Sequence, residues 1–197
     1  NEGVVYNQMV YNFPSTDKAS ATATIYTGTV PFYHGIVSDK KLSEDGFTEI
    51  SSFSDNKYMG NFTNEKLSPL PIKVSTITDE LKIASNGKSN VFAFSPDASG
   101  ALASGGHAAS GAFWIENYSG RWATTTFYTS YHSFVDEYNR SDESLNNRIS
   151  SLVWKPKLPV ESYNAFPYTQ NVKDFEHKLG SNKTNRFFLL KQTPFIN

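Results

Sequence analysis

The segment Pro14-Ser15-Thr16-Asp17-Lys18 places two hydroxyls, a carboxylate and an ammonium group within a few residues of one another. A strand-like stretch precedes it and a helix-like stretch follows it, so it lies where a strand passes into a helix. Free N–H groups and the helix dipole bind anions at such junctions. The pattern therefore fits a phosphate or sulfate site, with Lys18 as anion clamp and Thr16 or Ser15 as nucleophile. The same residues also fit an ordinary helix cap followed by an exposed lysine.

The histidines do not form a local metal motif, because none has a second histidine two, three or four residues away. The four are His34, His107, His132 and His177. The densest group of potential ligands is Asp174-Phe175-Glu176-His177. This run is typical of a solvated surface turn, because adjacent side chains seldom all face one ion. Neither a Gly-x-Ser-x-Gly nucleophile elbow nor a Gly-x-Gly-x-x-Gly dinucleotide motif occurs.

Two aromatic and β-branched runs, residues 112–115 and 121–128, are separated by a glycine-containing loop. This arrangement predicts a β-hairpin over about 112–128. Its aromatic side chains either stack a sugar or a base on an exposed face, or bury one aromatic face against a sheet. These side chains are Trp114, Trp122, Phe127 and Tyr128.

The elements expected to position these groups alternate between strands and helices. Residues 4–11 read as a strand, and residues 18–26 as a helix that ends before Gly28. Thr76-x-x-Asp79 resembles a capping box for a second helix, which ends at Asn86-Gly87. Residues 90–95 fit a buried parallel strand. The fold class is therefore α/β, a sheet flanked by helices with a hairpin insert, and residues 129–185 form an irregular, cap-like region.

Composition excludes several classes of function. The 197 residues carry 18 basic and 19 acidic side chains and include no cysteine. Without cysteine there are no disulfides, thiolate zinc sites or cysteine nucleophiles. A near-neutral balance without a basic block argues against nucleic acid as a partner, and no apolar run approaches the roughly 20 residues that cross a bilayer. Both ends of the chain read as core-like segments, which predicts a piece of a longer protein.

Several segments, in their order along the chain, resemble the alkaline phosphatase superfamily. The branch they resemble most is the type I phosphodiesterase/nucleotide pyrophosphatase group, with its bacterial threonine-nucleophile phosphatases. The resemblance covers most of residues 1–197, which it makes a partial alkaline-phosphatase-like domain. The segments are residues 1–4, 11–16, 24–31, 34–36, 91–95, 106–107, 112–128, 154–156 and 193–197.

The resemblance implies metal-dependent phosphoryl transfer, with two zinc ions and a Thr or Ser nucleophile at a helix N-terminus. Matched residue by residue, the nucleophile falls on Lys18 and the phosphate-contacting Asn falls on Asp39. The substrate-clamping Lys and Arg fall near Asp97 and Ser99, so neither positive charge is kept. A carboxylate repels a phosphate unless a metal intervenes. The zinc ligands of the family are expected outside residues 1–197.

Two explanations are open for the residues that differ from the family pattern. In one, the longer protein hydrolyses small phosphate or sulfate esters with Thr16, or another displaced hydroxyl, as nucleophile. In the other, a non-catalytic relative keeps the sheet and binds a glycan, an anion or a protein. In both, residues 1–197 alone are expected to be inactive, and the resemblance implies a periplasmic or extracellular location.

Overall fold

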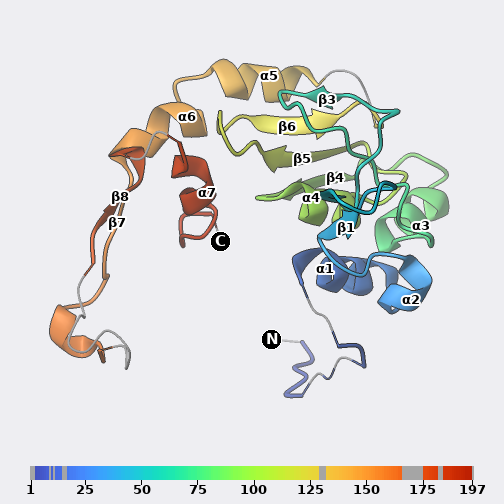
Figure 1. The fold of residues 1–197 in the computed structure, drawn as a ribbon, viewed down its shortest axis with the longest axis horizontal. Coiled ribbons are helices and arrows are strands. Elements are labelled where there is room, and N and C mark those ends of the chain that lie inside the picture. Colours follow the sequence, from blue (N-terminus) through green and yellow to red (C-terminus); the bar gives the residue numbers. More distant parts are fainter. Residues whose placement is uncertain are drawn as a thin grey trace. The chain divides into compact units, whose positions relative to one another are not determined.

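The structure is a computed structural model, which describes residues 3–8, 10, 12–14, 17–128, 132–165, 175–181 and 184–196. The chain divides into two compact units, shown as a ribbon in Figure 1. The first unit comprises residues 1–114 and 124–130. The second comprises residues 115–123 and 131–197.

The helices of the first unit begin and end at the signals that the sequence carries. Asp17 caps α1, accepting a hydrogen bond from the Ser20 N–H at 3.0 Å, and Gly28 ends the helix with a φ of 68°. Thr76 and Asp79 form a reciprocal capping box at the start of α3. Both predicted helices are thereby confirmed. Among the described residues of this unit, the helices are α1 (Lys18–Thr27), α2 (Pro31–His34), α3 (Ile77–Ala84) and α4 (Ala98–Gly105).

A four-stranded mixed sheet runs in the order β3-β6-β5-β4. Strand β4 pairs in parallel with β5, with Ala93 opposite Ala112, and β3 pairs antiparallel with β6. The predicted hairpin is confirmed as β5 and β6. The strands of the sheet are β3 (Gly60–Asn61), β4 (Phe92–Ser95), β5 (Gly111–Ile115) and β6 (Trp122–Thr125). A separate antiparallel ribbon joins β1 (Lys40–Leu42) to β2 (Glu49–Ser51).

Strand β4 confirms the expected parallel pairing, but the expectation that it is buried on both faces is wrong. Ala93 is buried, whereas Phe92 and Phe94 are 45% and 55% exposed. The physical reason is that Ala93 faces α4, whereas Phe92 and Phe94 point to the opposite face of the strand, where their rings pack against Phe113 of β5.

Small side chains make the helical core of the first unit. Ala19 and Ala23, one turn apart on α1, are fully buried, as are Ala101 and Ala103 on α4. The two helices pack against each other, and α4 also packs against β4. Alanines at the contact let the helix backbones approach closely. This close packing holds the N-terminus of α1 near that of α4.

The strand predicted over residues 4–11 is wrong for the residues the structure describes there. Residues 4–8 and 10 form neither helix nor strand. Val4, Val5, Tyr6 and Val10 are each between 77% and 89% exposed. Alternating apolar residues form a strand only where a neighbouring strand takes up their backbone hydrogen bonds.

The second unit is built around Ile149, Leu179, Phe187 and Leu190, all buried. Gly120, at a φ of 68°, lies so close to the Phe187 ring that an added Cβ would meet it at 2.0 Å. The helices and strands of this unit are α5 (Ser133–Arg140), α6 (Leu145–Arg148), β7 (Val153–Trp154), β8 (His177–Lys178) and α7 (Arg186–Leu190). Short 3-10 turns cover Ile149–Ser151, Val160–Ser162 and Leu179–Ser181.

Candidate functional site

The N-terminus of α1 is held by a carboxylate that reaches two chain segments. One oxygen of Asp17 accepts the Ser20 N–H at 3.0 Å, and the other accepts the Asp39 N–H at 2.7 Å. Asp17 therefore ties residue 39 to the start of the helix. Lys18 is the first residue of α1. Thr16 and Ser15, the two proposed hydroxyl nucleophiles, lie outside the described residues.

Lys18 forms an ion pair with Asp97. Asp97 follows β4 and is the N-cap residue of α4, where its side chain makes no capping hydrogen bond. The carboxylate takes the Lys18 ammonium instead. Since β4 ends at Ser95, the pair shows that α1 begins at the carboxyl end of that strand. This is the edge at which α/β sheets bind ligands.

Three of the residues that the resemblance singled out therefore lie together. Lys18, Asp39 and Asp97 are linked through the ion pair and through Asp17. Ser99 is half-buried in the first turn of α4. The roles proposed for Thr16, Lys18, Asp39, Asp97 and Ser99 stay predictions.

The charge of this group does not suit a phosphate dianion. Three carboxylates, those of Asp17, Asp39 and Asp97, accompany a single ammonium, which is already paired. One oxygen of Asp39 is buried and has no hydrogen-bond partner in the described part of the chain. An anion approaching α1 therefore meets repulsion from these carboxylates as well as attraction from the helix dipole.

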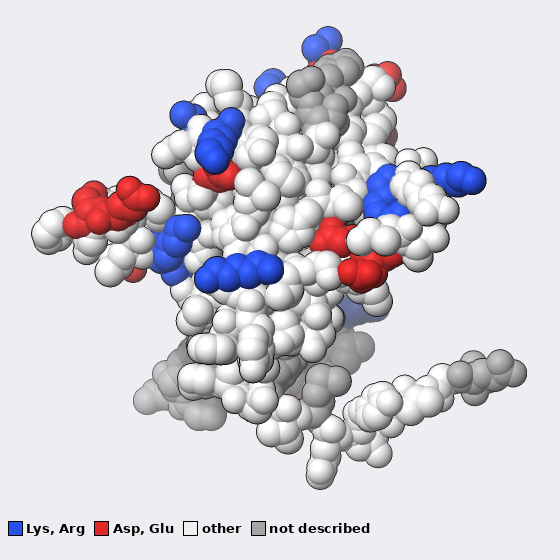
Figure 2. Space-filling view, turned by 90° about the vertical axis from the view of Figure 1, so that its right-hand side faces the viewer, with Lys and Arg blue, Asp and Glu red and all other residues white. Residues whose placement is uncertain are grey.

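Charged side chains of both signs are interspersed on the face shown in Figure 2. That face lacks the continuous basic surface on which nucleic-acid phosphates are bound. Within the described ranges, no helix is long and apolar enough to cross a membrane.

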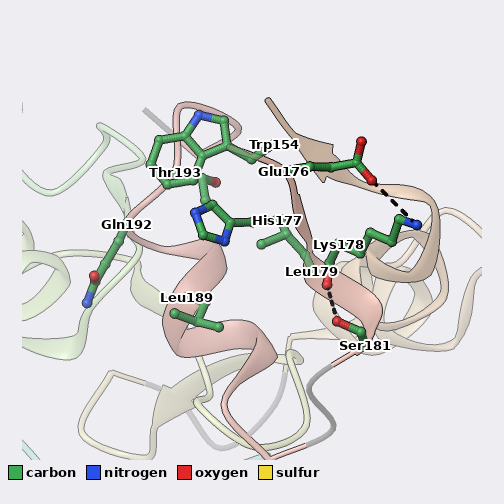
Figure 3. A pocket seen from close by; sticks show the side chains of 9 residues that line it. All are labelled: Trp154, Glu176, His177, Lys178, Leu179, Ser181, Leu189, Gln192 and Thr193. Atoms are coloured by element: carbon green, nitrogen blue, oxygen red, sulfur yellow. Dashed lines mark hydrogen bonds and ion pairs between the residues drawn. The ribbon is translucent and has the colours of Figure 1, made fainter. Parts of the chain in front are cut away.

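The candidate ligand run 174–177 falls in the second unit, where Asp174 lies outside the described residues. Glu176 and Lys178 are paired at 3.4 Å, and His177 lies between Trp154 and Leu189 (Figure 3). Three or more potential metal ligands come together nowhere in the part of the chain that the structure describes. The described residues therefore do not form the two-zinc site that the resemblance implies.

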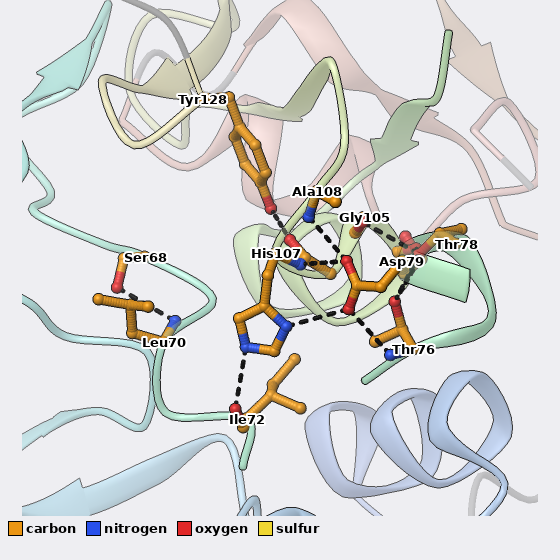
Figure 4. Close-up of polar contacts among 12 residues, drawn as sticks. Ser68, Leu70, Ile72, Thr76, Thr78, Asp79, Gly105, His107, Ala108 and Tyr128 are labelled. Atoms are coloured by element: carbon orange, nitrogen blue, oxygen red, sulfur yellow. Dashed lines mark hydrogen bonds and ion pairs between the residues drawn. The ribbon is translucent and has the colours of Figure 1, made fainter. Parts of the chain in front are cut away.

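A second polar cluster centres on Asp79, buried in the first turn of α3 (Figure 4). Its carboxylate accepts hydrogen bonds from the N–H groups of Thr76, His107 and Ala108 at 2.9, 2.7 and 2.7 Å. It also accepts from the His107 imidazole Nδ1 at 3.0 Å. The other ring nitrogen of His107 lies 3.0 Å from the Ile72 carbonyl oxygen. Both partners of the ring are acceptors, so these contacts favour the imidazolium form of His107, which donates from both nitrogens.

The titration of this pair follows from those contacts. Burial raises the pKa of Asp79, but the hydrogen bonds from His107, Thr76 and Ala108 together outweigh it and hold the pKa well below its usual range. The hydrogen bond to Asp79 raises the pKa of His107, although burial opposes it. Burial, and then the Asp79 charge, raises the pKa of Tyr128, whose hydroxyl donates to the Gly106 carbonyl at 2.6 Å.

This cluster ties three chain segments together, and the sequence signalled only one of its parts. The capping box predicted that Asp79 would face Thr76. Nothing local indicated that the same carboxylate would take a histidine 28 residues further on. Gly106, at a φ of 67°, leaves no room for a Cβ, which would meet the Thr76 hydroxyl at 2.1 Å. That close approach is the physical reason for a glycine before His107.

His34 is structural. It is fully buried, its Nδ1 accepts the Ile36 N–H at 3.1 Å, and its Nε2 therefore donates to the Thr24 hydroxyl at 3.1 Å. Burial lowers its pKa, which keeps the ring neutral.

The structure decides between the two alternatives left open for the hairpin aromatics in the case of Trp114. Trp114 and Phe113 on β5 are buried, and the Trp114 indole N–H donates to Glu65 at 3.3 Å. The binding of a sugar or a base on this ribbon is therefore wrong for Trp114. All five residues of β5 are buried, so both Trp114 and Phe113 lie inside although they point to opposite faces of the strand.

Comparison with known proteins identifies relatives of this chain. No family model matches the sequence. The alkaline phosphatase PhoV of Synechococcus elongatus is 31% identical over 197 residues, which cover 98% of this chain and 35% of that protein. The alkaline phosphatase PafA of Elizabethkingia meningoseptica is 27% identical over 221 residues, covering 100% of this chain and 39% of that protein. A Myroides odoratus protein named as a calcium-transporting ATPase is 27% identical over 98% of this chain and 38% of its own length.

A crystal structure of wild-type PafA matches 74% of this chain with a TM-score of 0.65 and 26% sequence identity, covering 28% of the PafA chain. The fold is thus that of part of an alkaline phosphatase. These relatives confirm the resemblance to the alkaline phosphatase superfamily, while its phosphodiesterase/pyrophosphatase branch stays a prediction. The chain spans between a third and two fifths of the length of the curated relatives it matches.

Proposed function

We propose that this chain is a segment of a phosphoric ester hydrolase of the type I phosphodiesterase/nucleotide pyrophosphatase kind. The observation that carries the proposal is the position of α1, whose first residue pairs with Asp97 at the carboxyl end of β4. A helix N-terminus at the carboxyl edge of a sheet is where phosphate groups bind. The names of the two alkaline phosphatases similar to the chain give further support.

The longer protein is proposed to use zinc and to act on a small phosphate or sulfate ester outside the cytoplasm, in the periplasm or beyond it. Thr16 is the proposed nucleophile, and Lys18 is its proposed electrostatic partner.

Residues 1–197 alone are proposed to be inactive, because the zinc ligands of the family are expected to lie outside them. Lys18, at the position where the resemblance places the family's nucleophile, is an amine that cannot form the usual phosphoester, and its charge is paired with Asp97. Asp39 and Asp97 replace an amide and a cation of the family pattern, so the group repels a phosphate.

The Lys18–Asp97 ion pair also favours a second candidate function. A relative that has lost the chemistry would keep the fold and fill the former phosphate position with its own ion pair. Such a protein would serve as a binding module for an anion, a glycan or another protein.

Activity is tested with p-nitrophenyl phosphate and bis-p-nitrophenyl phosphate, with and without added zinc. The chain is expected to show no zinc-dependent release of nitrophenol. Turnover that depends on zinc and is lost in Thr16→Ala would contradict the proposed inactivity and would identify the nucleophile. The residues that flank this stretch in the longer protein separate the two candidates: intact Asp and Asp-His-Gly ligands favour the hydrolase, and their loss favours the module.

The anion clamp is tested by sulfate titration followed by the amide signals of α1 in NMR spectra. Asp97→Asn releases the ammonium and is expected to tighten sulfate binding about tenfold, because one repulsive charge also disappears. Lys18→Ala is expected to weaken it. Lys40→Ala, which breaks the exposed ion pair with Glu49, is the matched control. Equal affinity in all four proteins would remove Lys18 from the proposal.

A further inference from the structure

A cavity of about 240 Å³ opens in the second unit, between the β7–β8 ribbon and α7 with its following turn (Figure 3). We call it the Trp154 cavity. Its lining residues are Trp154, Glu176, His177, Lys178, Leu179, Ser181, Leu189, Gln192 and Thr193. Ligand pockets for drug-sized molecules begin at about 300 Å³, so this cavity matches a ligand of one ring.

One wall of the Trp154 cavity is aromatic. Trp154 and His177 are partners across the β7–β8 ribbon, with ring centroids 5.5 Å apart and planes tilted by 36°. Phe175 buttresses both rings, at 5.0 Å from Trp154 and 5.5 Å from His177. A ring held by two neighbours offers a rigid apolar surface at little cost in conformational entropy. Leu189, 40% exposed, faces this wall from α7.

The polar groups at the rim of the cavity carry no net charge. Glu176 and Lys178 neutralise each other at 3.4 Å, and Figure 3 shows their side chains pointing toward one another. The Ser181 and Thr193 hydroxyls donate to the backbone carbonyls of Lys178 and Leu190.

Two side chains remain able to bind a ligand. The Gln192 amide and the His177 ring nitrogens make no hydrogen bond to the residues that the structure describes. Each of these groups offers both a donor and an acceptor when the imidazole is neutral. Gln192 and His177 line the same cavity, so a single ligand can use both.

We propose that the Trp154 cavity binds one neutral pyranose ring, with the apolar face of the sugar on Trp154 and its hydroxyls on Gln192 and His177. A pyranose has one face of C–H bonds, which suits an aromatic ring, and an edge of hydroxyls that both donate and accept. A phosphorylated or acidic ligand is disfavoured because Lys178 is already paired. The proposal uses residues of the second unit alone and does not rest on the phosphoric ester hydrolase.

The test is a titration of the full chain with methyl glucoside, methyl galactoside and methyl mannoside, followed by the indole and imidazole signals in NMR spectra. We expect saturable shifts of the Trp154 and His177 signals for at least one glycoside, with a Kd of roughly 1–10 mM, as suits a single small contact. Trp154→Ala should weaken binding at least tenfold, and Trp154→Phe should restore part of it.

Gln192→Ala is a second test that should leave the fold intact, because this side chain is exposed and its amide makes no hydrogen bond to the described residues. It is expected to weaken binding severalfold while leaving the spectrum otherwise unchanged. Tyr118→Ala, which removes an aromatic ring that is 77% exposed and does not line the cavity, is the matched control and should bind as the parent does.

Three results would overturn the proposal. They are the absence of any shift at about 50 mM glycoside, shifts that survive unchanged in both Trp154→Ala and Gln192→Ala, and saturable shifts with adenosine or inorganic phosphate but with no glycoside. Zinc-dependent ester hydrolysis, whether present or absent, leaves the sugar proposal unaffected.

Discussion

Replacement of Asp79 by alanine is expected to destabilise the first unit strongly. The substitution removes the acceptor of four hydrogen bonds, which range from 2.7 to 3.0 Å, and leaves His107 without its counter-charge. A buried donor left unsatisfied costs about 1–3 kcal/mol, and breaking a buried charge pair costs about 3–5 kcal/mol. These contributions overlap, so the expected loss is about 4 kcal/mol. The total free energy of unfolding of a domain of this size is about 5–15 kcal/mol.

Urea unfolding followed by circular dichroism measures the loss. Glu80→Ala is the matched control, because Glu80 is the next residue of α3 and is exposed; its effect should stay within about 0.5 kcal/mol. If the two variants unfold at the same urea concentration, the Asp79 hydrogen bonds do not stabilise the fold as reasoned.

The same pair predicts a pH dependence. The lowered pKa of Asp79 stabilises the fold above the unfolded value of about 3.9, and this stability is lost as the pH falls. The raised pKa of His107 stabilises the fold fully below about 6.5, and this stability is lost as the pH rises through the folded value. The pair therefore contributes most between about pH 4 and 6.5. In Asp79→Asn, NMR titration should show the His107 pKa moving back down, and an unchanged value would refute the assignment.

Other predictions concern single side chains. Gly120→Ala should cost more than about 2 kcal/mol, because the new Cβ overlaps Phe187, whereas Gly46→Ala, also at positive φ but in open space, should cost about 1 kcal/mol in urea unfolding. Tyr128 should stay protonated when absorbance at alkaline pH reports the ionisation of the exposed tyrosines, since burial raises its pKa; a titration that includes every tyrosine together would contradict this. Lys18→Ala should change the free energy of unfolding by less than about 0.5 kcal/mol, because the ion pair is partly exposed; a loss above about 2 kcal/mol would show that the pair has a structural role.

Local signals predicted much of the fold. The cap and the glycine of α1, the capping box of α3 and the glycine loop of the hairpin each depend on residues a few positions apart. Hydrogen bonds within one turn fix such features, whatever the rest of the chain does. The strand prediction for residues 4–11 was wrong for the opposite reason, because a strand forms only when a partner distant in sequence pairs with it.

The site was predicted only in part, because its contacts join residues far apart in the sequence. The resemblance singled out Lys18 and Asp97, but their ion pair spans 79 positions and appears only when β4 and α1 are folded. Likewise, Trp154 and His177 meet because two short strands pair that lie about 20 positions apart in the sequence. The spacing of residues along the sequence does not predict such long-range contacts.

The one-sided pairing of β4 bears on how the isolated chain behaves at high concentration. In the described part of the sheet, the outer backbone edge of this strand has no strand beside it, and Phe92 and Phe94 next to it are largely exposed. A second molecule can pair its own β4 edge with this one, and because both molecules then use the same surface, the assembly closes as a two-fold dimer. Concentrated samples should accordingly contain a share of dimer that rises with protein concentration, and a lysine in place of Phe94 should keep the molecules apart.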